Sequence, residues 1–594
     1  MSIDSPGSVV AYGHGVELRL RADVRMVARR MFGGAKQTRS DVIRLTLTPE
    51  NARTLKMLLA GFALDLDAAA ARMLEIGLTE LEHRQRVVAS VLRGGARDHV
   101  EVDLARPARE YQIDVVRLLR AVRGVLCADD MGLGKTVSAI ACIAAIPEMR
   151  PAIVVVPSNL THQWRRKFRE FAPTLAVHVA EKTKPYDISA VSAAALKRDY
   201  NPEARHHPDV LVLSYTQIDG WSSVLTSAPW RSIVLDEVQA LRAGDKTARY
   251  RAVRAVSSTV SYRLGLSGTP IYNYAGEIFW VLSALAPDVL GEREEFAREW
   301  CSQDERVTDP EALGARLRES GVMLRRTRRD VGLQLPHVER IVQPTDCSPH
   351  AVERIGGAAG ELARVLLAQS GHTSLERMRA ASEMINQLRQ ATGIGKAPAV
   401  AAFVRELVEE GRRVILYGFH RAVYDIWRES FRDPANGPPI PVRMITGSET
   451  PTQKDDAVRD FCREGGARVL IVSLRSGAGI DGLQHVCSTV VFGELDWSPK
   501  VHDQCVMRVD RDGQTEPVQA FFCASEIGAD PIMVEVNGAK RNNSEPVIDP
   551  DDARARREAA ASDDTTLDEL PSDITQRVAR SIVDGSYLRP RGET

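Results

Sequence analysis

The segment 126–139 reads LCADDMGLGKTVSA and brings carboxylates, glycines, a lysine and a hydroxyl close together. Such a segment binds phosphate when its glycines let successive backbone N–H groups approach an anion, its lysine reaches the β- and γ-phosphates and its hydroxyl holds Mg²⁺. It follows the apolar run VLCA and precedes the apolar helical pattern VSAIACIAAI, which is the strand–loop–helix context that a phosphate loop requires. We therefore expect a nucleotide site whose contacts are Asp129, Asp130, Met131, Gly132, Leu133, Gly134, Lys135 and Thr136.

A second acidic motif, SIVLDEVQ at 232–239, follows another apolar run. Phosphoryl transfer to water needs a carboxylate for Mg²⁺ and a second group that positions or deprotonates the water. We expect Asp236 to hold Mg²⁺ together with Thr136, and Glu237 to act on the water. An Asp-Glu pair is commonly a solvated surface pair, but its place at the end of a buried strand favours a catalytic role.

A similar stretch, GIGK at 393–396, serves as an internal control for the phosphate loop. It follows a helical pattern instead of a strand, and Ala397 and Pro398 follow its lysine where a loop would have a hydroxyl. We interpret it as a turn before a helix.

The elements that must position these residues form two series of apolar strand-like runs separated by helical patterns. This alternation is typical of a parallel sheet covered by helices on both faces. The sequence therefore predicts an α/β fold with two tandem lobes, a small N-terminal α+β region and a largely disordered tail with one short helix near Ile574–Val583. The predicted boundaries are 1–104 for the accessory region, 105–340 for lobe 1, 341–394 for a helical linker, 395–545 for lobe 2 and 546–594 for the tail.

Composition excludes several classes of protein. The 594 residues exceed one ordinary core, and 78 Lys and Arg nearly balance 79 Asp and Glu, so any nucleic-acid contact must come from local basic patches. Apolar runs stay well below the ~20 residues of a membrane span, and the N-terminus lacks a secretory pattern. The eight cysteines never form a C-x-x-C pair, which predicts buried free thiols and no structural zinc. We expect an intracellular protein without a membrane partner.

The ordered set of motifs resembles the SWI/SNF-type, helicase-like ATPases of helicase superfamily two over residues 105–540. The motifs that carry the resemblance are EYQ (110–112), DDMGLGKT (129–136), VVVPSNLTHQWRRKFREF (154–171), DEVQ (236–239), LGLSGTPIYN (264–273), MLRRTRRDVGLQLP (323–336), SLRSGAGIDGLQ (473–484) and VVFGELDWSPKVHDQCVMRVDRDGQ (490–514). In that family an acidic residue normally stands where Asp129 does. The sequence ELDWSP and the segment 393–423 resemble the annealing-helicase, fork-remodelling branch of the family. Residues 23–55 resemble the small DNA-structure-binding module of that branch and a plain β-α cap about equally well.

The resemblance implies two RecA-like lobes with ATP between them. It makes Gln112 the residue that reads adenine, places Gly479 and Gln504 at the nucleotide, and makes Arg508 and Arg511 paired arginine fingers. A planar, permanently charged guanidinium suits the negative charge that spreads over a transferring phosphoryl group.

Two basic segments are candidates for contact with phosphates of DNA: Arg165, Arg166, Lys167 and Arg169, and then Arg325, Arg326, Arg328 and Arg329. The second set could instead brace lobe 1, and Trp164 beside the first set is expected in the core. The chain departs from the family at Asp510, where His is usual, and at Asp512, where an apolar residue is usual. Two carboxylates interleaved with Arg508 and Arg511 could pair with the fingers, compete with phosphate for them and slow turnover.

These observations lead to a DNA-dependent ATPase that translocates on duplex or forked DNA and remodels it, in DNA repair or replication-fork processing. Alternatives are a strand-separating helicase, the motor of a defence or restriction system, or a weakly hydrolysing nucleotide- and DNA-binding scaffold. The expected location is cytoplasmic, at the nucleoid in a bacterium or virus and in the nucleus of a eukaryote. Protein partners are not indicated.

Overall fold

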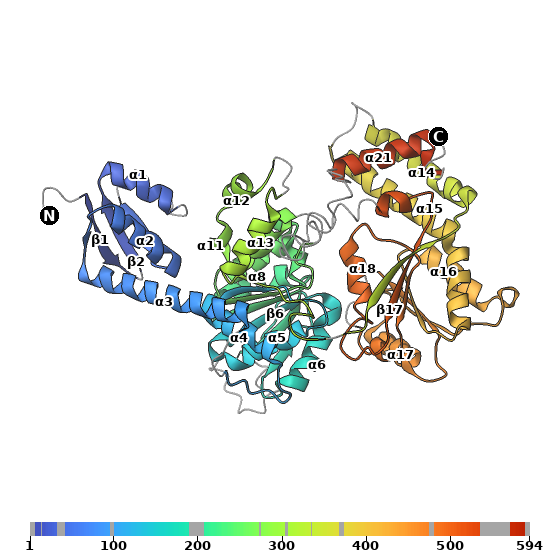
Figure 1. The fold of residues 1–594 in the computed structure, drawn as a ribbon, viewed down its shortest axis with the longest axis horizontal. Coiled ribbons are helices and arrows are strands. Elements are labelled where there is room, and N and C mark those ends of the chain that lie inside the picture. The colour runs from blue at the N-terminus through green and yellow to red at the C-terminus, as the bar shows by residue number, and fades with distance from the viewer. Residues whose placement is uncertain are drawn as a thin grey trace.

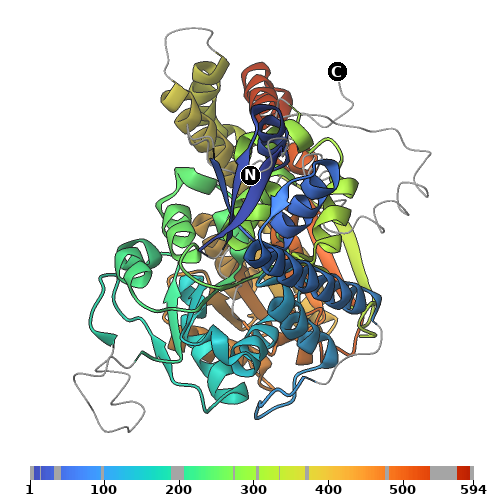
Figure 2. The same ribbon diagram turned by 90° about the vertical axis from the view of Figure 1, so that its left-hand side faces the viewer.

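The structure is a computed structural model that describes residues 6–13, 15–32, 42–94, 100–188, 207–271, 275–302, 307–333, 335–367, 374–474, 480–534 and 571–588. Within these ranges the chain forms an N-terminal module and two larger α/β lobes, each around its own sheet (Figure 1). Figure 2 views the molecule from the end that carries the N-terminal module.

The N-terminal module packs helices on one small sheet with strand order β3-β2-β1-β4. Its last helix, α3, leaves the module and continues to lobe 1 (Figure 1). Leu74 near the start of α3 belongs to the core of the module, whereas Val88 and Val91 near its end belong to the core of lobe 1. The expected boundary at residue 104 therefore falls after a helix that both parts share. The elements are β1 (Gly7–Tyr12), β2 (Gly15–Leu20), α1 (Ala22–Met31), β3 (Val42–Thr46), α2 (Pro49–Gly61), β4 (Asp65–Leu66) and α3 (Ala68–Arg93).

Lobe 1 is built on a sheet whose described strands, in the order β11-β5-β10-β9-β6-β8-β7, all pair in parallel. Its strands are β5 (Gly124–Cys127), β6 (Ala152–Val156), β7 (Val177–Val179), β8 (Val210–Ser214), β9 (Ser232–Asp236), β10 (Tyr262–Leu266) and β11 (Met323–Leu324). Its helices are α4 (Glu110–Val122), α5 (Lys135–Ala145), α6 (Thr161–Phe171), α8 (Ile218–Ser227), α9 (Ala248–Ser257), α10 (Ile278–Leu285), α11 (Pro287–Leu290), α12 (Arg293–Trp300) and α13 (Pro310–Glu319).

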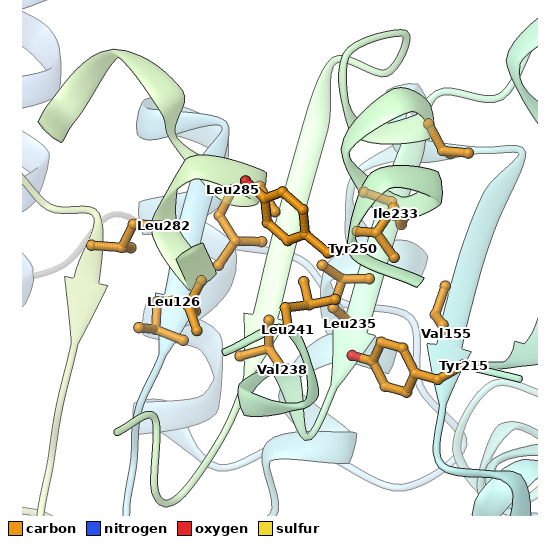
Figure 3. Packing of buried hydrophobic residues seen from close by; sticks show 14 of the residues in the cluster. Leu126, Val155, Tyr215, Ile233, Leu235, Val238, Leu241, Tyr250, Leu282 and Leu285 are labelled. Carbon is orange, nitrogen blue, oxygen red and sulfur yellow. The ribbon is translucent and has the colours of Figure 1, made fainter. Parts of the chain in front are cut away.

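Apolar side chains leave both faces of this sheet, because successive residues of a strand point to opposite sides. Leu126 of β5 packs on the side of α9 and α10 (Figure 3), whereas its neighbours Val125 and Cys127 pack with α4, α5 and α6 on the other side. The parallel register aligns Cys127 with Leu266, and Leu266 with Asp236. The segments that follow β5, β10 and β9 therefore begin side by side at one edge.

Lobe 2 repeats the architecture with the strand order β12-β17-β16-β13-β15-β14, again parallel in the described residues. Two parallel-sheet lobes confirm the predicted fold class. Strand β12, however, lies at the edge of the second sheet, so lobe 2 takes in residues that we had placed in lobe 1 and the linker. Its elements are β12 (Val338–Pro344), α14 (Pro349–Leu367), α15 (Ser374–Glu409), β13 (Val414–Gly418), α16 (Arg421–Arg432), β14 (Val442–Ile445), α17 (Pro451–Cys462), β15 (Val469–Ser473), β16 (Thr489–Phe492), α18 (Pro499–Val506) and β17 (Val518–Ala524).

The GIGK stretch is helical, and our interpretation of it as a turn was wrong. It lies inside α15, with Pro398 inside the same helix. Lys396 is buried and forms an ion pair with Asp530 at 2.6 Å while donating to the Cys523 carbonyl at 2.7 Å. A Cβ on Gly393 would lie 2.7 Å from Glu494 Oε1, so the glycine is needed for close packing of the helix. The lysine is therefore structural.

The end of the chain contributes to lobe 2. Helix α21 (Pro571–Asp584) covers the short helix that we expected near Ile574–Val583. Val578, Ala579 and Ile582 are buried in the core of lobe 2, which the sequence did not indicate. Residues 546–570 of the predicted disordered tail lie outside the described residues.

None of the described helices combines the length and the apolar character that crossing a membrane would require. All eight cysteines are free thiols. Among the described residues no group of three potential metal-ligating His, Cys, Asp or Glu side chains occurs.

Candidate nucleotide site between the lobes

The phosphate loop joins β5 to α5 at the carboxyl edge of the first sheet. Gly132 and Gly134 have φ values of 90° and 74°, a left-handed backbone that strains any residue with a side chain. A Cβ on Gly134 would also lie 2.5 Å from Gln112 Nε2. The backbone therefore requires both glycines, and packing against Gln112 also requires Gly134.

Lys135 is held inside this loop. Its Nζ donates to the carbonyl oxygens of Asp129 at 2.8 Å and Asp130 at 3.1 Å. Burial lowers the pKa of the Lys135 ammonium, and the nearby acidic groups oppose this effect. The lysine is thus preorganised in the loop, and a bound phosphate would compete with these carbonyls for it.

Gln112 and its neighbour Tyr111, at the start of α4, support the loop from below. Gln112 Nε2 donates to the Leu133 carbonyl at 3.0 Å, while its Oε1 accepts from Arg109 N at 2.9 Å. Tyr111 OH donates to the same Leu133 carbonyl at 3.1 Å. Gln112 is therefore adjacent to the loop as expected, but its amide is already engaged. Reading adenine, as the resemblance implies, stays a prediction.

Asp129 is buried and pairs with Arg326, which follows β11. Its carboxylate is 1% exposed and accepts from Arg326 Nε at 3.0 Å and Nη2 at 2.5 Å. Arg326 also donates to Asp114 Oδ2 at 3.2 Å. Both oxygens of Asp129 are occupied, so this residue can serve a phosphate only through its backbone.

Arg325 and Arg328, on either side of Arg326, also contact the phosphate loop. Arg325 pairs with Asp130 at 2.6 Å. Arg328 donates to the Met131 carbonyl at 3.2 Å, so the segment after β11 clamps the whole loop. Among the four arginines that were candidates for DNA contact or bracing, Arg325, Arg326 and Arg328 therefore brace lobe 1, and Arg329 is exposed.

Asp236 and Glu237 follow β9 beside the phosphate loop. Asp236 Oδ1 accepts from Glu237 N at 3.1 Å, and its Oδ2 accepts from the indole N–H of Trp164 at 2.7 Å. Burial, together with the Glu237 carboxylate, raises the pKa of Asp236 to about 7. Trp164 is in the core as predicted, at 1% exposure, but its hydrogen bond to Asp236 was not predicted.

Glu237 itself is held in an unusual conformation. Its φ of 50° lies in the left-handed region, which is uncommon for a residue with a side chain and typical of functional sites. Gln239 Nε2 donates to Glu237 Oε2 at 2.5 Å and fixes the carboxylate. The other Glu237 oxygen can therefore act on a water.

Thr136 and Asp236 provide the donor set for a divalent cation. Thr136 stands in the first turn of α5, and Asp236 ends β9, two positions in the sheet away from β5. Hydroxyl and carboxylate oxygens are the ligands that Mg²⁺ prefers. The residues present fit the metal that the sequence predicted.

Arg511 of lobe 2 lies against this loop. A Cβ placed on Gly132 would lie 3.6 Å from Arg511 Cβ. The Arg511 guanidinium donates to Asp481 Oδ1 at 2.7 Å, and Asp481 Oδ2 accepts from Gln163 of lobe 1 at 3.0 Å. Asp481 was not predicted, although it lies in the motif that we quoted for lobe 2. Arg511 is thus positioned opposite the loop and held by a carboxylate.

Arg508 lies one turn earlier and is half-buried. Its charge acts on Tyr417 and Cys505, where it opposes the rise that burial gives to both pKa values. The Arg508 guanidinium forms no hydrogen bond or ion pair with any described residue. Gln504, in α18, donates to Thr269 Oγ1 of lobe 1 at 3.2 Å. Gly479 lies outside the described residues.

Asp510 and Asp512 do not pair with the arginine fingers, and that expectation was wrong. Asp510 pairs with Arg328 at 2.6 Å, and Asp512 pairs with Arg109 at 2.5 Å, so both partners come from lobe 1. The reason is geometric, because Asp481 already occupies Arg511. The two departures from the family therefore join the lobes instead of blocking the site.

The chain is similar to a known protein family over more than half of its length. The family described as the SNF2-related domain matches residues 75–392, which is more than half of the 594 residues. The match begins within α3 and extends into α15.

Curated relatives are similar over most of this chain. The "ISWI chromatin-remodeling complex ATPase ISW2" of Saccharomyces cerevisiae is 24% identical over 507 residues, 77% of this chain and 42% of that protein. The mouse "DNA annealing helicase and endonuclease ZRANB3" is 26% identical over 70% of this chain and 38% of its own length. A Drosophila melanogaster SWI/SNF-related "subfamily A-like protein 1" is 26% identical over 73% of this chain and 55% of its own length. The chain thus spans about half, or less, of the length of these relatives.

Among solved structures, the Sulfolobus solfataricus SWI2/SNF2 ATPase core in complex with dsDNA is 21% identical and covers 77% of this chain and 96% of its own. The TM-score of 0.35 is low, and we draw nothing from this likeness.

The buried pair between Asp129 and Arg326 leads to a prediction about stability. Arg326→Met leaves a carboxylate buried without its partner and should lower the free energy of unfolding of lobe 1 by about 3–5 kcal/mol. Urea denaturation measures the change, with Arg329→Met at the exposed neighbour as the control. The double change Arg326→Met with Asp129→Asn should recover part of the loss. An Arg326→Met protein as stable as the control would contradict this.

The pairs that join the lobes lead to a prediction about their arrangement. The buried pair between Asp510 and Arg328 is a charge-assisted hydrogen bond of about 1.5–3 kcal/mol, so its loss should shift the ratio of open to closed forms about tenfold or more, whereas the exposed pair between Asp512 and Arg109 should add little. Asp510→Asn combined with Asp512→Asn should therefore enlarge the radius of gyration of the nucleotide-free protein, as measured by small-angle X-ray scattering. Asp503→Asn is the control, since Asp503 pairs with Arg340 inside lobe 2. The same radius for both variants would show that the pairs do not hold the lobes together.

Proposed function

The chain belongs to the family of the SNF2-related domain, and from this we propose that it is an ATP hydrolase that translocates on duplex or forked DNA and remodels it. One observation carries the proposal. Lys135, Asp236 and Glu237 lie close enough on lobe 1 for their charges to interact, and Arg511 of lobe 2 lies against the same loop. A site completed by two lobes ties the chemistry to their movement.

ATP would bind with its phosphates in the loop 129–136, where backbone N–H groups at the start of α5 and the Lys135 ammonium face the anion. Thr136 and Asp236 would hold Mg²⁺, which when bound neutralises part of the phosphate charge. Glu237 positions the attacking water and takes up its proton. The hydrogen bond from Gln239 holds the Glu237 carboxylate in its orientation.

Arg511 and Arg508 would stabilise the charge that develops on the transferred phosphoryl group. Arg511 has to exchange its Asp481 oxygen for a phosphate oxygen to do so. Such an exchange replaces one charge-assisted hydrogen bond by another, so its net cost is small. Arg508 has no such partner among the described residues. Binding of the triphosphate therefore favours the closed arrangement, and hydrolysis releases it.

Nucleic acid would lie along the exposed side of α6. Arg165, Arg166 and Arg169 are exposed on this helix, while Trp164 and Phe168 face the core. Lys167 pairs with Glu170 at 3.0 Å and is less available. A row of exposed guanidiniums suits phosphates and reads little sequence. The choice of DNA draws on the relatives, among which the mouse protein is named a DNA annealing helicase and endonuclease, and the choice of forks draws on the resemblance of ELDWSP and residues 393–423 to the fork-remodelling branch. Action on DNA implies a location at the nucleoid or in the nucleus.

Measurement of ATP hydrolysis with duplex, forked and single-stranded DNA tests the proposal. We expect stimulation by duplex and forked DNA, loss of activity in Lys135→Ala, and a decrease of about 10²-fold or more in kcat for Glu237→Gln. A strand-annealing and fork-regression assay on the same substrates then distinguishes remodelling from strand separation. Hydrolysis that no nucleic acid stimulates would leave only a scaffold, and stimulation by RNA alone would overturn the choice of DNA.

The basic side of α6 makes a separate prediction about affinity. Arg165→Glu combined with Arg166→Glu should weaken duplex binding by the same factor for every DNA sequence. It should also reduce the slope of log affinity against log salt concentration by about 2. Fluorescence anisotropy of a labelled duplex measures both quantities. Arg428→Glu with Arg432→Glu on α16 is the charge-matched control. Equal salt slopes in the two variants would remove α6 from the DNA path.

A further inference from the structure

Helix α6 contacts both halves of the nucleotide site with consecutive residues. Trp164 donates to Asp236 of lobe 1, and Gln163 donates to Asp481 of lobe 2, which holds Arg511. The exposed arginines of the same helix point away from the core. One short helix therefore lies between a basic surface and both sets of catalytic side chains.

Trp164 donates to Asp236 from within the core of lobe 1. The Trp164 indole is buried in the core formed with α4 and α5, and its ring packs against Phe168 with centroids 5.9 Å apart. Its N–H has one acceptor, Asp236 Oδ2 at 2.7 Å. The remaining oxygen, Oδ1, accepts from Glu237 N at 3.1 Å. The orientation of the Asp236 carboxylate is thus set by a core residue of α6 and by the backbone of its own neighbour.

The contact with Arg511 passes through a shared carboxylate. Asp481 uses Oδ1 for Arg511 and Oδ2 for Gln163. The separate oxygens let Gln163 fix Asp481 without displacing the arginine. Because a hydrogen bond of this length is lost beyond about 3.5 Å, a movement of α6 by about 1 Å is enough to alter both contacts.

We propose that α6 couples DNA contact to ATP hydrolysis, with Trp164 as the positioning residue for Asp236 and Gln163, through Asp481, as the positioning residue for Arg511. The coupling rests on the proposed function, since it assumes that DNA contacts the exposed side of α6. The positioning of Asp236 does not depend on DNA and is testable without it. Partners that orient a metal ligand commonly change metal affinity or activity by about 10–100-fold when they are removed.

The main variant is Trp164→Phe, which removes the N–H donor and keeps an aromatic ring in the core. Trp221→Phe is the matched control, because Trp221 is also fully buried in lobe 1 and donates its indole N–H at 3.0 Å, to the Lys182 carbonyl. Thermal unfolding of both variants shows whether the loss of a buried indole costs the same stability in each.

The first measurement is binding of a fluorescent N-methylanthraniloyl ADP as the Mg²⁺ concentration is raised, without DNA. Trp164→Phe should need about tenfold more Mg²⁺ for half-maximal binding, whereas Trp221→Phe should match the unaltered protein. Equal Mg²⁺ requirements in the two variants would overturn the role of Trp164. This readout stands even if DNA does not stimulate the protein, so the two failures are distinguishable.

The second measurement distinguishes the contact of Trp164 with Asp236 from the contact of Gln163 with Asp481. Trp164→Phe and Gln163→Ala should each lower DNA-stimulated kcat by about tenfold, and both should leave the dissociation constant for a labelled duplex within about twofold. Gln163→Ala should not change the Mg²⁺ requirement, because its path runs to Arg511. Weakened duplex binding in step with the lost activity would show that these residues bind DNA, and would overturn the coupling.

Discussion

The nucleotide site depends on the buried pairing of Asp129 with Arg326. The first residue opens the phosphate loop, and the second follows the last strand of lobe 1, 197 positions later. A bidentate pair of this kind adds little net stability, because both charges lose water, but losing one partner is costly. It therefore acts as a constraint on geometry. It fixes the loop to the point where the chain leaves lobe 1 for lobe 2.

Two ion pairs join lobe 1 to lobe 2 near this point. Arg328, two residues further, contacts both the loop and Asp510, so one cation touches both lobes. The second pair, Arg109 with Asp512, is about half exposed on each side and contributes little in salt. One ion pair between the lobes is therefore buried, and the other is exposed to solvent.

The strand context predicted the phosphate loop and the acidic pair because local signals suffice there: an apolar strand, glycines and an apolar helix. The pairings of Asp129, Asp236 and Asp510 could not be predicted, because their partners lie far away in sequence. The error at 393–396 has a different cause. Glycine and proline usually end a helix, but tight packing against Glu494 and Cys347 leaves no room for a Cβ at Gly393 and Gly395, and tertiary contacts outweigh propensity in α15.

Helix α3 has a mechanical consequence. Its 26 residues give a rod of about 39 Å, and one end is embedded in the N-terminal core while the other is embedded in lobe 1. The small sheet at its far end is therefore joined to lobe 1 by one continuous helix, whose length sets the spacing between the sheet and lobe 1. A ligand bound by the N-terminal module would therefore lie at a fixed distance from the phosphate loop of lobe 1.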